Sequence, residues 1–134
     1  MSKTKKRSTC AISSMLDLLG DKWSLLIIRD MVFFGKKTYG EFLSSNEKIS
    51  TNILADRLAL LEKEKIITKE EHPDNKTKYI YALTQKGIDL LPVLIEIVIW
   101  SSKYLEISDR AKELAKKAVK DRIALIKSIT GKSA

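Results

Sequence analysis

The chain has 134 residues, of which 44% are hydrophobic and 31% are charged, and no stretch rich in Ser, Gly or Pro divides it. This length can bury one sizeable core, so we expect a single domain. A single cysteine and a single histidine exclude an internal disulfide framework and a zinc cluster, and the longest apolar run, residues 90–100, is too short to span a membrane. The sequence therefore predicts a soluble, cytoplasmic protein without a metal, a cofactor or membrane contact.

The formal net charge of +8 lies at the two ends of the chain. Residues 11–104 carry 13 basic and 13 acidic side chains, whereas residues 1–10 carry four basic ones and residues 105–134 carry eight basic and four acidic ones. A positive balance is typical of proteins that bind nucleic acids, but a basic end is equally consistent with a solubilising tail. We expect residues 1–9 to form a flexible basic tail, and the charge gives DNA binding only weak support.

Two helices are predicted first along the chain. Residues 12–19 place apolar side chains at helical spacing and end at Gly20, a common residue after a helix. Residues 23–34 repeat the helical spacing, with Arg29 and Asp30 on the face opposite the apolar one. The predicted helices each have one face for a core.

A short helix, a tight turn and a longer helix follow. Thr38 and Glu41 fit the capping box T-x-x-E that opens a short helix. Ser50 can cap the next helix, in which the leucines at positions 54, 58 and 61 form one apolar face and leave the other face free. This order of elements predicts a helix-turn-helix.

A β-hairpin is predicted immediately after the longer helix. Residues 66–70 and 78–83 are rich in β-branched and aromatic side chains, and they flank the turn-forming residues 72–77. The sequence therefore predicts a mainly α fold with a small β-hairpin (α+β), that is, a winged helix-turn-helix over residues 10–104.

Two further helices are expected towards the C-terminus. Thr84 can cap a helix with a broad apolar face, in which Pro92 allows only a mild kink. Residues 107–129 have the pattern of one long amphipathic helix, within a C-terminal extension at 105–134. One small domain offers little surface to cover both apolar stripes, so we expect a symmetric homodimer in which the N- and C-terminal helices form the interface.

Residues between positions 10 and 100 share their order and spacing with a known family: Cys10, Leu16–Gly20, Lys22, Trp23, Tyr39–Phe42, Ile49, Ser50, Leu54, Arg57, Leu58, Leu61, Glu62, Tyr81–Thr84, Gly87 and Trp100. In these positions the chain resembles the HxlR-type winged-helix transcription regulators. The resemblance implies dimers that bind operator DNA, that pair through their first and last helices, and that in some members sense electrophiles or oxidants through the N-terminal cysteine. Ala11, Asp21 and Lys65 depart from the family pattern, which often has a proline or a glycine there.

The free face of the helix after Ser50 carries the candidates for reading DNA bases. Thr51, Asn52 and Asp56 can reach base edges, because an amide pairs with adenine and a carboxylate accepts a hydrogen bond from cytosine. Ser50 is a candidate DNA contact that we interpret first as a helix cap. Arg57 is a candidate for either a phosphate contact or a structural ion pair.

Five lysines are candidates for phosphate contacts: Lys22, Lys36, Lys37, Lys76 and Lys78. Each of them is also consistent with an ordinary solvated surface charge. Cys10 follows a basic segment at the start of the first helix, where the helix dipole and the cations favour a thiolate. A reactive, effector-sensing thiol and an inert small side chain both remain open.

Together these patterns predict a homodimer that binds a pseudo-palindromic operator in double-stranded DNA and regulates transcription, with Cys10 as a candidate sensor. The alternative is a winged-helix module that contacts only other proteins, which the balanced charge of residues 11–104 permits. An enzyme is not expected, because the sequence has no phosphate-binding glycine loop, metal cluster or nucleophile with a base partner. The sequence does not identify a small-molecule effector.

Overall fold

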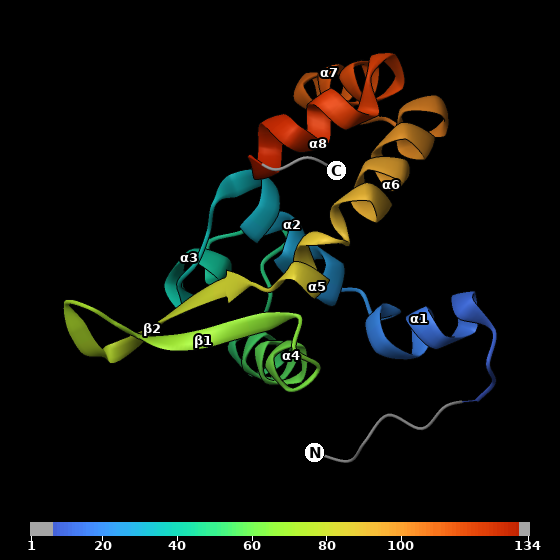
Figure 1. The fold of residues 1–134 in the computed structure, drawn as a ribbon. Coiled ribbons are helices and arrows are strands. Elements are labelled where there is room, and N and C mark those ends of the chain that lie inside the picture. Colours follow the sequence, from blue (N-terminus) through green and yellow to red (C-terminus); the bar gives the residue numbers. More distant parts are fainter. Residues whose placement is uncertain (1–6, 132–134) are drawn as a thin grey trace.

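The computed structural model describes residues 7–131 and consists of helices and one β-hairpin (Figure 1). The elements in chain order are α1 (Ala11–Leu19), α2 (Ser24–Phe34), α3 (Tyr39–Leu43), α4 (Thr51–Lys63), β1 (Ile67–His72), β2 (Asn75–Leu83), α5 (Gln85–Ile88), α6 (Leu91–Tyr104), α7 (Asp109–Lys120) and α8 (Arg122–Thr130). This is the predicted winged helix-turn-helix, with helices added at both ends. The predicted basic tail, residues 1–9, falls largely outside the described residues.

The main core lies where α2, α3, α4 and the base of the hairpin meet. Its most deeply buried side chains are Ile28, Phe42, Leu54, Leu61, Ile66 and Ile67. The rings of Phe42 and Tyr81 meet edge to face, with centroids 6.1 Å apart, so α3 is packed against β2. The predicted leucine face of α4 is confirmed, because Leu54, Leu58 and Leu61 are all buried.

Side-chain caps fix both helices of the helix-turn-helix. The capping box of α3 is complete: Thr38 Oγ1 accepts from the Glu41 backbone, and Glu41 Oε1 accepts from the Thr38 backbone. Ser50 Oγ accepts from the backbone N–H of Ile53 and opens α4. The Tyr39 hydroxyl donates to the Thr51 carbonyl at 2.9 Å, which ties the first turn of α4 to α3.

The hairpin is longer and its turn tighter than the sequence predicted. The strands are antiparallel, with Ile67 opposite Leu83 and His72 opposite Asn75, so only Pro73 and Asp74 lie between them. The outer residues of both strands are polar and exposed. Their backbone groups still pair, because hydrogen bonds between antiparallel strands do not depend on the side chains.

The segment after the hairpin was predicted as one mildly kinked helix, and this was wrong. Thr84 caps the single-turn helix α5 by accepting from the Gly87 backbone, and α6 then begins separately, with Pro92 in its first turn. Proline there has no helical hydrogen bond to lose. Gly87 is required because a Cβ at this position would lie 2.4 Å from the Ile66 carbonyl oxygen.

The single long helix expected over residues 107–129 is also divided in two. Asp121 has an extended backbone (φ −157°, ψ 93°), and its carboxylate accepts from the Ala124 backbone to cap α8. The break lets α8 fold back, so that Leu125 and Ile126 join Leu91, Ile95, Ile99 and Ala118 in a second core. The chain thus covers much of this apolar stripe itself, although Val119 stays 70% exposed. The homodimer expected from the apolar stripes remains a prediction.

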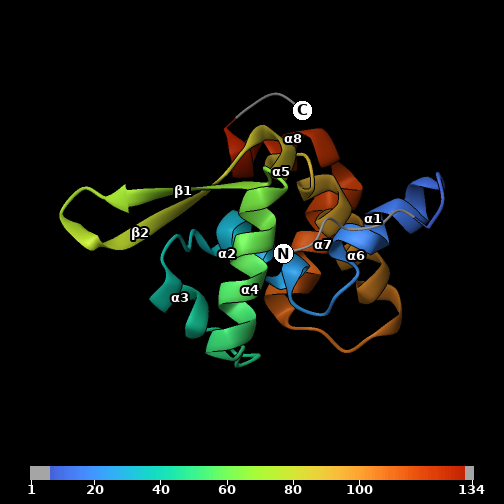
Figure 2. The same cartoon turned by 90° about the horizontal axis from the view of Figure 1, so that it is seen from below.

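Figure 1 shows α7 and α8 at one end of the molecule, with α4 and the hairpin at the other. Seen from below in Figure 2, α4 crosses the middle of the surface, with the hairpin extending to one side and α1 to the other. No helix within residues 7–131 is long and apolar enough to cross a membrane.

Candidate nucleic-acid interface

The outer face of α4 presents the base-reading candidates to solvent. Thr51, Asn52 and Asp56 are all exposed, and the leucines hold the opposite face of α4 in the core. The Ser50 cap fixes the N-terminus of the helix. This end of α4 therefore offers hydrogen-bonding side chains on a rigid support.

Arg57 is held by two carboxylates of its own chain. Its guanidinium lies 2.8 Å from Asp56 Oδ2 and 3.6 Å from Asp21 Oδ1. Of the two roles open to Arg57, the structure supports the ion pair. Asp56 is in turn partly neutralised, which reduces its repulsion of phosphates.

Asp21 connects this pair to the start of α2. Its carboxylate accepts from the Ser24 hydroxyl and from the backbone N–H groups of Trp23 and Ser24. Burial by itself would raise the pKa of Asp21, but these hydrogen bonds and the Arg57 charge hold it below the usual value of 3.8. In the sequence Asp21 stood out only as a departure from a glycine, although Asp is a common residue just before a helix.

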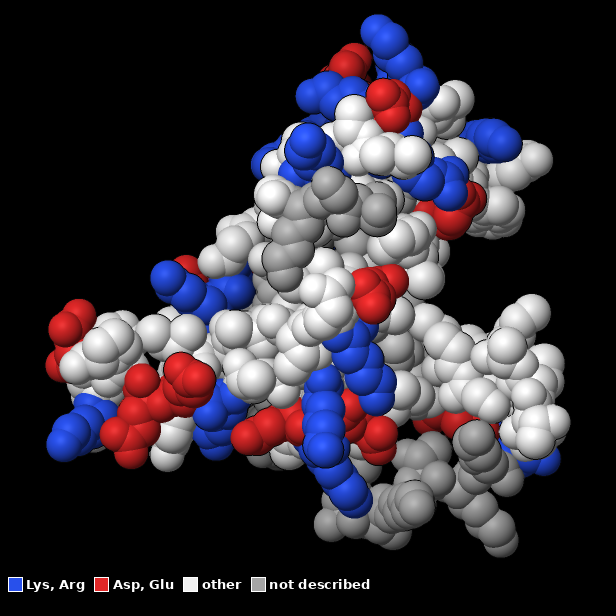
Figure 3. All heavy atoms as spheres, in the orientation of Figure 1, with Lys and Arg blue, Asp and Glu red and all other residues white. Residues whose placement is uncertain are grey.

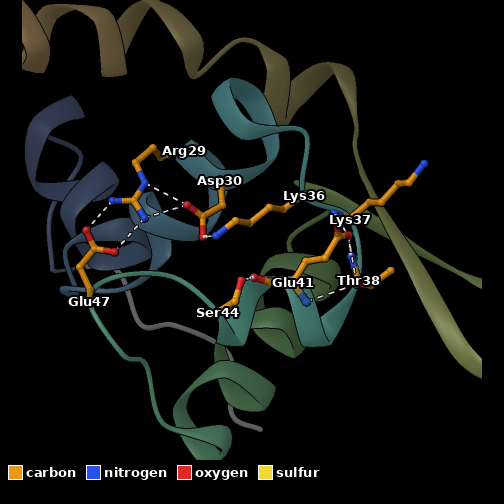
Figure 4. A network of polar contacts seen from close by, with 8 residues as sticks. All are labelled: Arg29, Asp30, Lys36, Lys37, Thr38, Glu41, Ser44 and Glu47. Carbon is orange, nitrogen blue, oxygen red and sulfur yellow. Dashed lines mark hydrogen bonds and ion pairs between the residues drawn. The ribbon is translucent and has the colours of Figure 1, made fainter. Parts of the chain in front are cut away.

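The three lysines before α3 have different surroundings. Lys22 is exposed, with Nζ 5.1 Å from the Trp23 ring centroid. Lys36 turns inward, with Nζ 3.5 Å from Asp30 Oδ2, whereas the Lys37 side chain extends away from the polar network (Figure 4). Lys22 and Lys37 are therefore available for a phosphate, and Lys36 is engaged within the fold.

The sequence did not predict a polar network that links α2 with the turn before α4 (Figure 4). Asp30, expected on an outer face, is only 2% exposed and accepts two hydrogen bonds from Arg29. Arg29 also donates at 2.7 and 2.9 Å to the two carboxylate oxygens of Glu47, in the turn before α4. These hydrogen bonds raise the pKa of Arg29 and lower that of Glu47. The network joins α2 to the loop that positions α4.

The wing carries exposed charges of both signs. Lys76, expected in the turn, lies in β2 together with Lys78. Both are exposed, and neither has an ion-pair partner within residues 7–131. Figure 3 shows Lys and Arg gathered over α7 and α8, while the hairpin and the surface near α4 also carry Asp and Glu. On the wing, positive charge is therefore confined to the surroundings of its lysines.

Cys10 is exposed and occupies the N-cap position of α1. The backbone N–H groups of Ser13 and Ile12 face its sulfur and lower the pKa of the thiol, although neither makes a hydrogen bond of standard geometry. Arg7 pairs with Asp17 at 2.6 Å instead of the sulfur, and Lys5 and Lys6 lie outside the described residues. Among the described residues, it is therefore the start of α1 that favours the thiolate.

Comparison with protein families gives a match over residues 18–109, to the family described as HxlR-like helix-turn-helix. The chain belongs to the HxlR family. Among its HxlR-type relatives, the uncharacterized HTH-type transcriptional regulator sll1512 of Synechocystis sp. is 36% identical over 72% of this chain and 71% of that protein. The HTH-type transcriptional regulator YodB of Bacillus subtilis is 34% identical over 76% of this chain and 90% of YodB.

Solved structures of transcription regulators share this fold. The reduced form of YodB aligns with a TM-score of 0.59 and 34% identity over 76% of this chain and all of YodB. The crystal structure of PA1607 aligns with a TM-score of 0.68 and 36% identity over 78% of this chain and 71% of that one. YodB has also been solved after diamide treatment and with bound quinone, and the redox regulator HypR in its oxidized form. Family and fold therefore identify a DNA-binding transcription regulator of the winged-helix type.

Proposed function

We propose that this protein is a cytoplasmic, homodimeric regulator that binds a pseudo-palindromic operator, with α4 of each subunit in a major groove and each wing on the flanking backbone. The observation that carries the proposal is that Thr51 and Asn52 are exposed at the start of α4. The helix α4 lies on the same side of the molecule as the hairpin (Figure 2). Helix-turn-helix proteins read bases with this part of the second helix. Ser50 caps the helix, and Asp56 and Arg57 flank the reading face as a pair.

Asn52 is the sharpest test of base reading. Asn52→Ala should lose about 1–3 kcal/mol of binding free energy on the preferred operator and little on random DNA, because an amide can bond adenine at two atoms. Fluorescence anisotropy with labelled duplexes measures both affinities. Asn46→Ala is the matched control, since Asn46 is exposed but lies outside α4. Equal losses on operator and random DNA would rule out base reading by Asn52.

The exposed lysines should contribute similarly to the binding of every DNA sequence, because they contact phosphates. Lys76→Ala and Lys78→Ala should weaken binding to operator and random DNA by similar factors, and each should reduce the slope of log affinity against log salt by about 1. Lys22→Ala and Lys37→Ala should behave in the same way. Lys36→Ala is the internal comparison, because its ammonium is already beside Asp30. An unchanged salt slope would remove the tested lysine from the interface.

The dimer is proposed from apolar side chains that remain exposed on α1 and α6. Ile12 is 73% exposed and Trp100 is 57% exposed, and Leu16, Ile97 and Tyr104 are exposed as well. Exposed large apolar side chains that belong to the same elements are typical of protein–protein interfaces. Light scattering should give twice the 15.2 kDa chain mass at micromolar concentration, and Ile97→Glu should give the chain mass. A monomeric wild type would refute the dimer.

Cys10 is proposed as a sensor of electrophiles or oxidants, on the basis of its exposure and its lowered thiol pKa. Its thiolate adds to a quinone ring carbon, and proton uptake leaves the reduced quinone attached to sulfur. With diamide, the thiolate adds to the N=N bond and a second thiol displaces the hydrazine, so the partner is Cys10 of another subunit or a small thiol. Operator binding should change after either treatment in the wild type and stay constant in Cys10→Ser. Identical responses would make Cys10 structural.

A further inference from the structure

The C-terminal helices line a cavity that is open to solvent on one side and that the DNA-binding face does not use. It has a volume of about 570 Å³ and lies between α2, α6, α7 and α8. Val32 and Phe33 of α2, Val98 of α6, Leu114 of α7 and Ile129 of α8 supply apolar walls. This volume is within the range of small-molecule sites, about 300–1,000 Å³.

Two unpaired cations stand on the lining of this cavity. Arg110 and Lys117 both come from α7, and neither has a carboxylate partner within residues 7–131. The guanidinium of Arg110 lies 5.6 Å from the centroid of the Phe34 ring, which holds it over an aromatic face. The acidic side chain on the lining, Glu113, pairs with Lys116 at 3.8 Å. The lining therefore combines an apolar body with uncompensated positive charge.

We propose that this cavity binds a small amphipathic carboxylic acid, with an aromatic or aliphatic body against the walls and a carboxylate at Arg110 and Lys117. Arginine and lysine make charge-assisted hydrogen bonds with carboxylates, and burial of the acid's hydrocarbon part supplies the remaining free energy. The site is separate from the proposed dimer surface, because Val98 faces the cavity whereas Ile97 and Trp100 are exposed on other faces of α6.

A third cation links the cavity to the DNA-binding end. Arg29 also lines the cavity, and its guanidinium binds both Asp30 and Glu47. Glu47 stands in the turn before α4, so an acid that attracts Arg29 competes with the contact that holds this turn. Occupancy of the cavity then changes operator affinity, a regulatory step that rests on the proposed function.

Calorimetry on the full chain tests the site independently of DNA. The probes are 1-naphthoate and decanoate, and 1-naphthamide is a neutral control of the same shape as the first. We expect one acid per chain and binding of the amide at least ~10-fold weaker, because the amide lacks the charged hydrogen bonds. Failure of both acids to bind at millimolar concentration, or equal binding of 1-naphthoate and 1-naphthamide, would overturn the proposal.

Matched variants locate the probe. Arg110→Gln/Lys117→Gln should weaken acid binding by ~10-fold or more, whereas Lys112→Gln/Lys120→Gln makes the same charge change on α7 away from the lining and should leave it within ~2-fold. Ile97→Glu should also retain binding. Loss of binding in Ile97→Glu but not in Arg110→Gln/Lys117→Gln would place the acid on the exposed α6 surface and refute the cavity site.

Operator binding in the presence of the acid tests the regulatory step. Saturating 1-naphthoate should change the operator Kd of the wild type by at least ~5-fold, the lower end of typical allosteric couplings, and should leave that of Arg110→Gln/Lys117→Gln unchanged. Acid binding without any change in operator affinity would refute the regulation while the site stands. A chain that binds no operator at all would refute the proposed function, and calorimetry would still decide the site.

Discussion

Lys65→Gly should stabilise this protein, because Lys65 ends α4 with a left-handed backbone. Its φ is 61°, a conformation that is unfavourable by about 1–2 kcal/mol for a residue with a Cβ. Glycine removes that penalty but makes the unfolded chain more flexible, which offsets about 0.4–1 kcal/mol. The net gain in the free energy of unfolding is about 0.5–1 kcal/mol, or about 2–4 °C in Tm for a chain of this length.

Urea unfolding at fixed protein concentration measures the gain. The backbone bonds at this position do not depend on the side chain: the Lys65 N–H donates to Glu62, and its carbonyl accepts from Thr84 Oγ1. Lys65→Ala keeps the Cβ and should leave the midpoint almost unchanged, whereas Ala59→Gly inside α4 should lower stability by about 1 kcal/mol. A lower midpoint for Lys65→Gly, or equal shifts for the glycine and alanine variants, would refute the reasoning.

Three further predictions concern stability. Phe42→Ala should lower the free energy of unfolding by about 3–5 kcal/mol, because the ring is 1% exposed and packs on Tyr81. A loss below about 1 kcal/mol, measured by chemical denaturation, would contradict this prediction. Arg29 lowers the pKa of Glu47 below its usual value of 4.5. The ion pair therefore stabilises the fold fully above pH 4.5, and this stabilisation is lost as the pH falls through the pKa of Glu47 in the folded protein. Below pH 4.5 the wild type should therefore lose stability more steeply than Glu47→Gln, and parallel curves would exclude the pair as a contributor. Ending the chain at residue 106 should expose the second core, and so lower the Tm and raise the fluorescence of an added anilinonaphthalene dye. An unchanged Tm would show that α7 and α8 do not contribute to stability.

Local signals in the sequence were sufficient to predict the helix-turn-helix and the wing. Thr38, Glu41 and Ser50 act through backbone groups at most three residues away, so their pattern determines where α3 and α4 begin. The leucine spacing of α4 is equally local. The placement of Thr51 and Asn52 on a free face followed from that spacing and agrees with their exposure.

Features that depend on distant parts of the chain were not predictable from local patterns. Asp30 is buried because Arg29 and Lys36 neutralise it, and the Glu47 carboxylate that completes the network comes from another loop. Asp121 is a typical N-cap residue, but the amphipathic spacing continues across it and therefore predicted one unbroken helix. The cavity arises only when α7 and α8 fold back on α2, which no single stretch of sequence encodes.

The second core also has a consequence for synthesis on the ribosome. Leu91, Ile95 and Ile99 belong to α6, but Leu125 and Ile126, which cover them, come at the far end of the chain. At about 5–20 residues per second, the roughly 25 residues between Ile99 and Leu125 take about 1–5 s to make. During that interval the winged helix-turn-helix is already complete in sequence, but the residues that cover one side of α6 have not yet been made. The second core can therefore close only after the winged helix-turn-helix, so these two parts of the chain become able to fold in that order during synthesis.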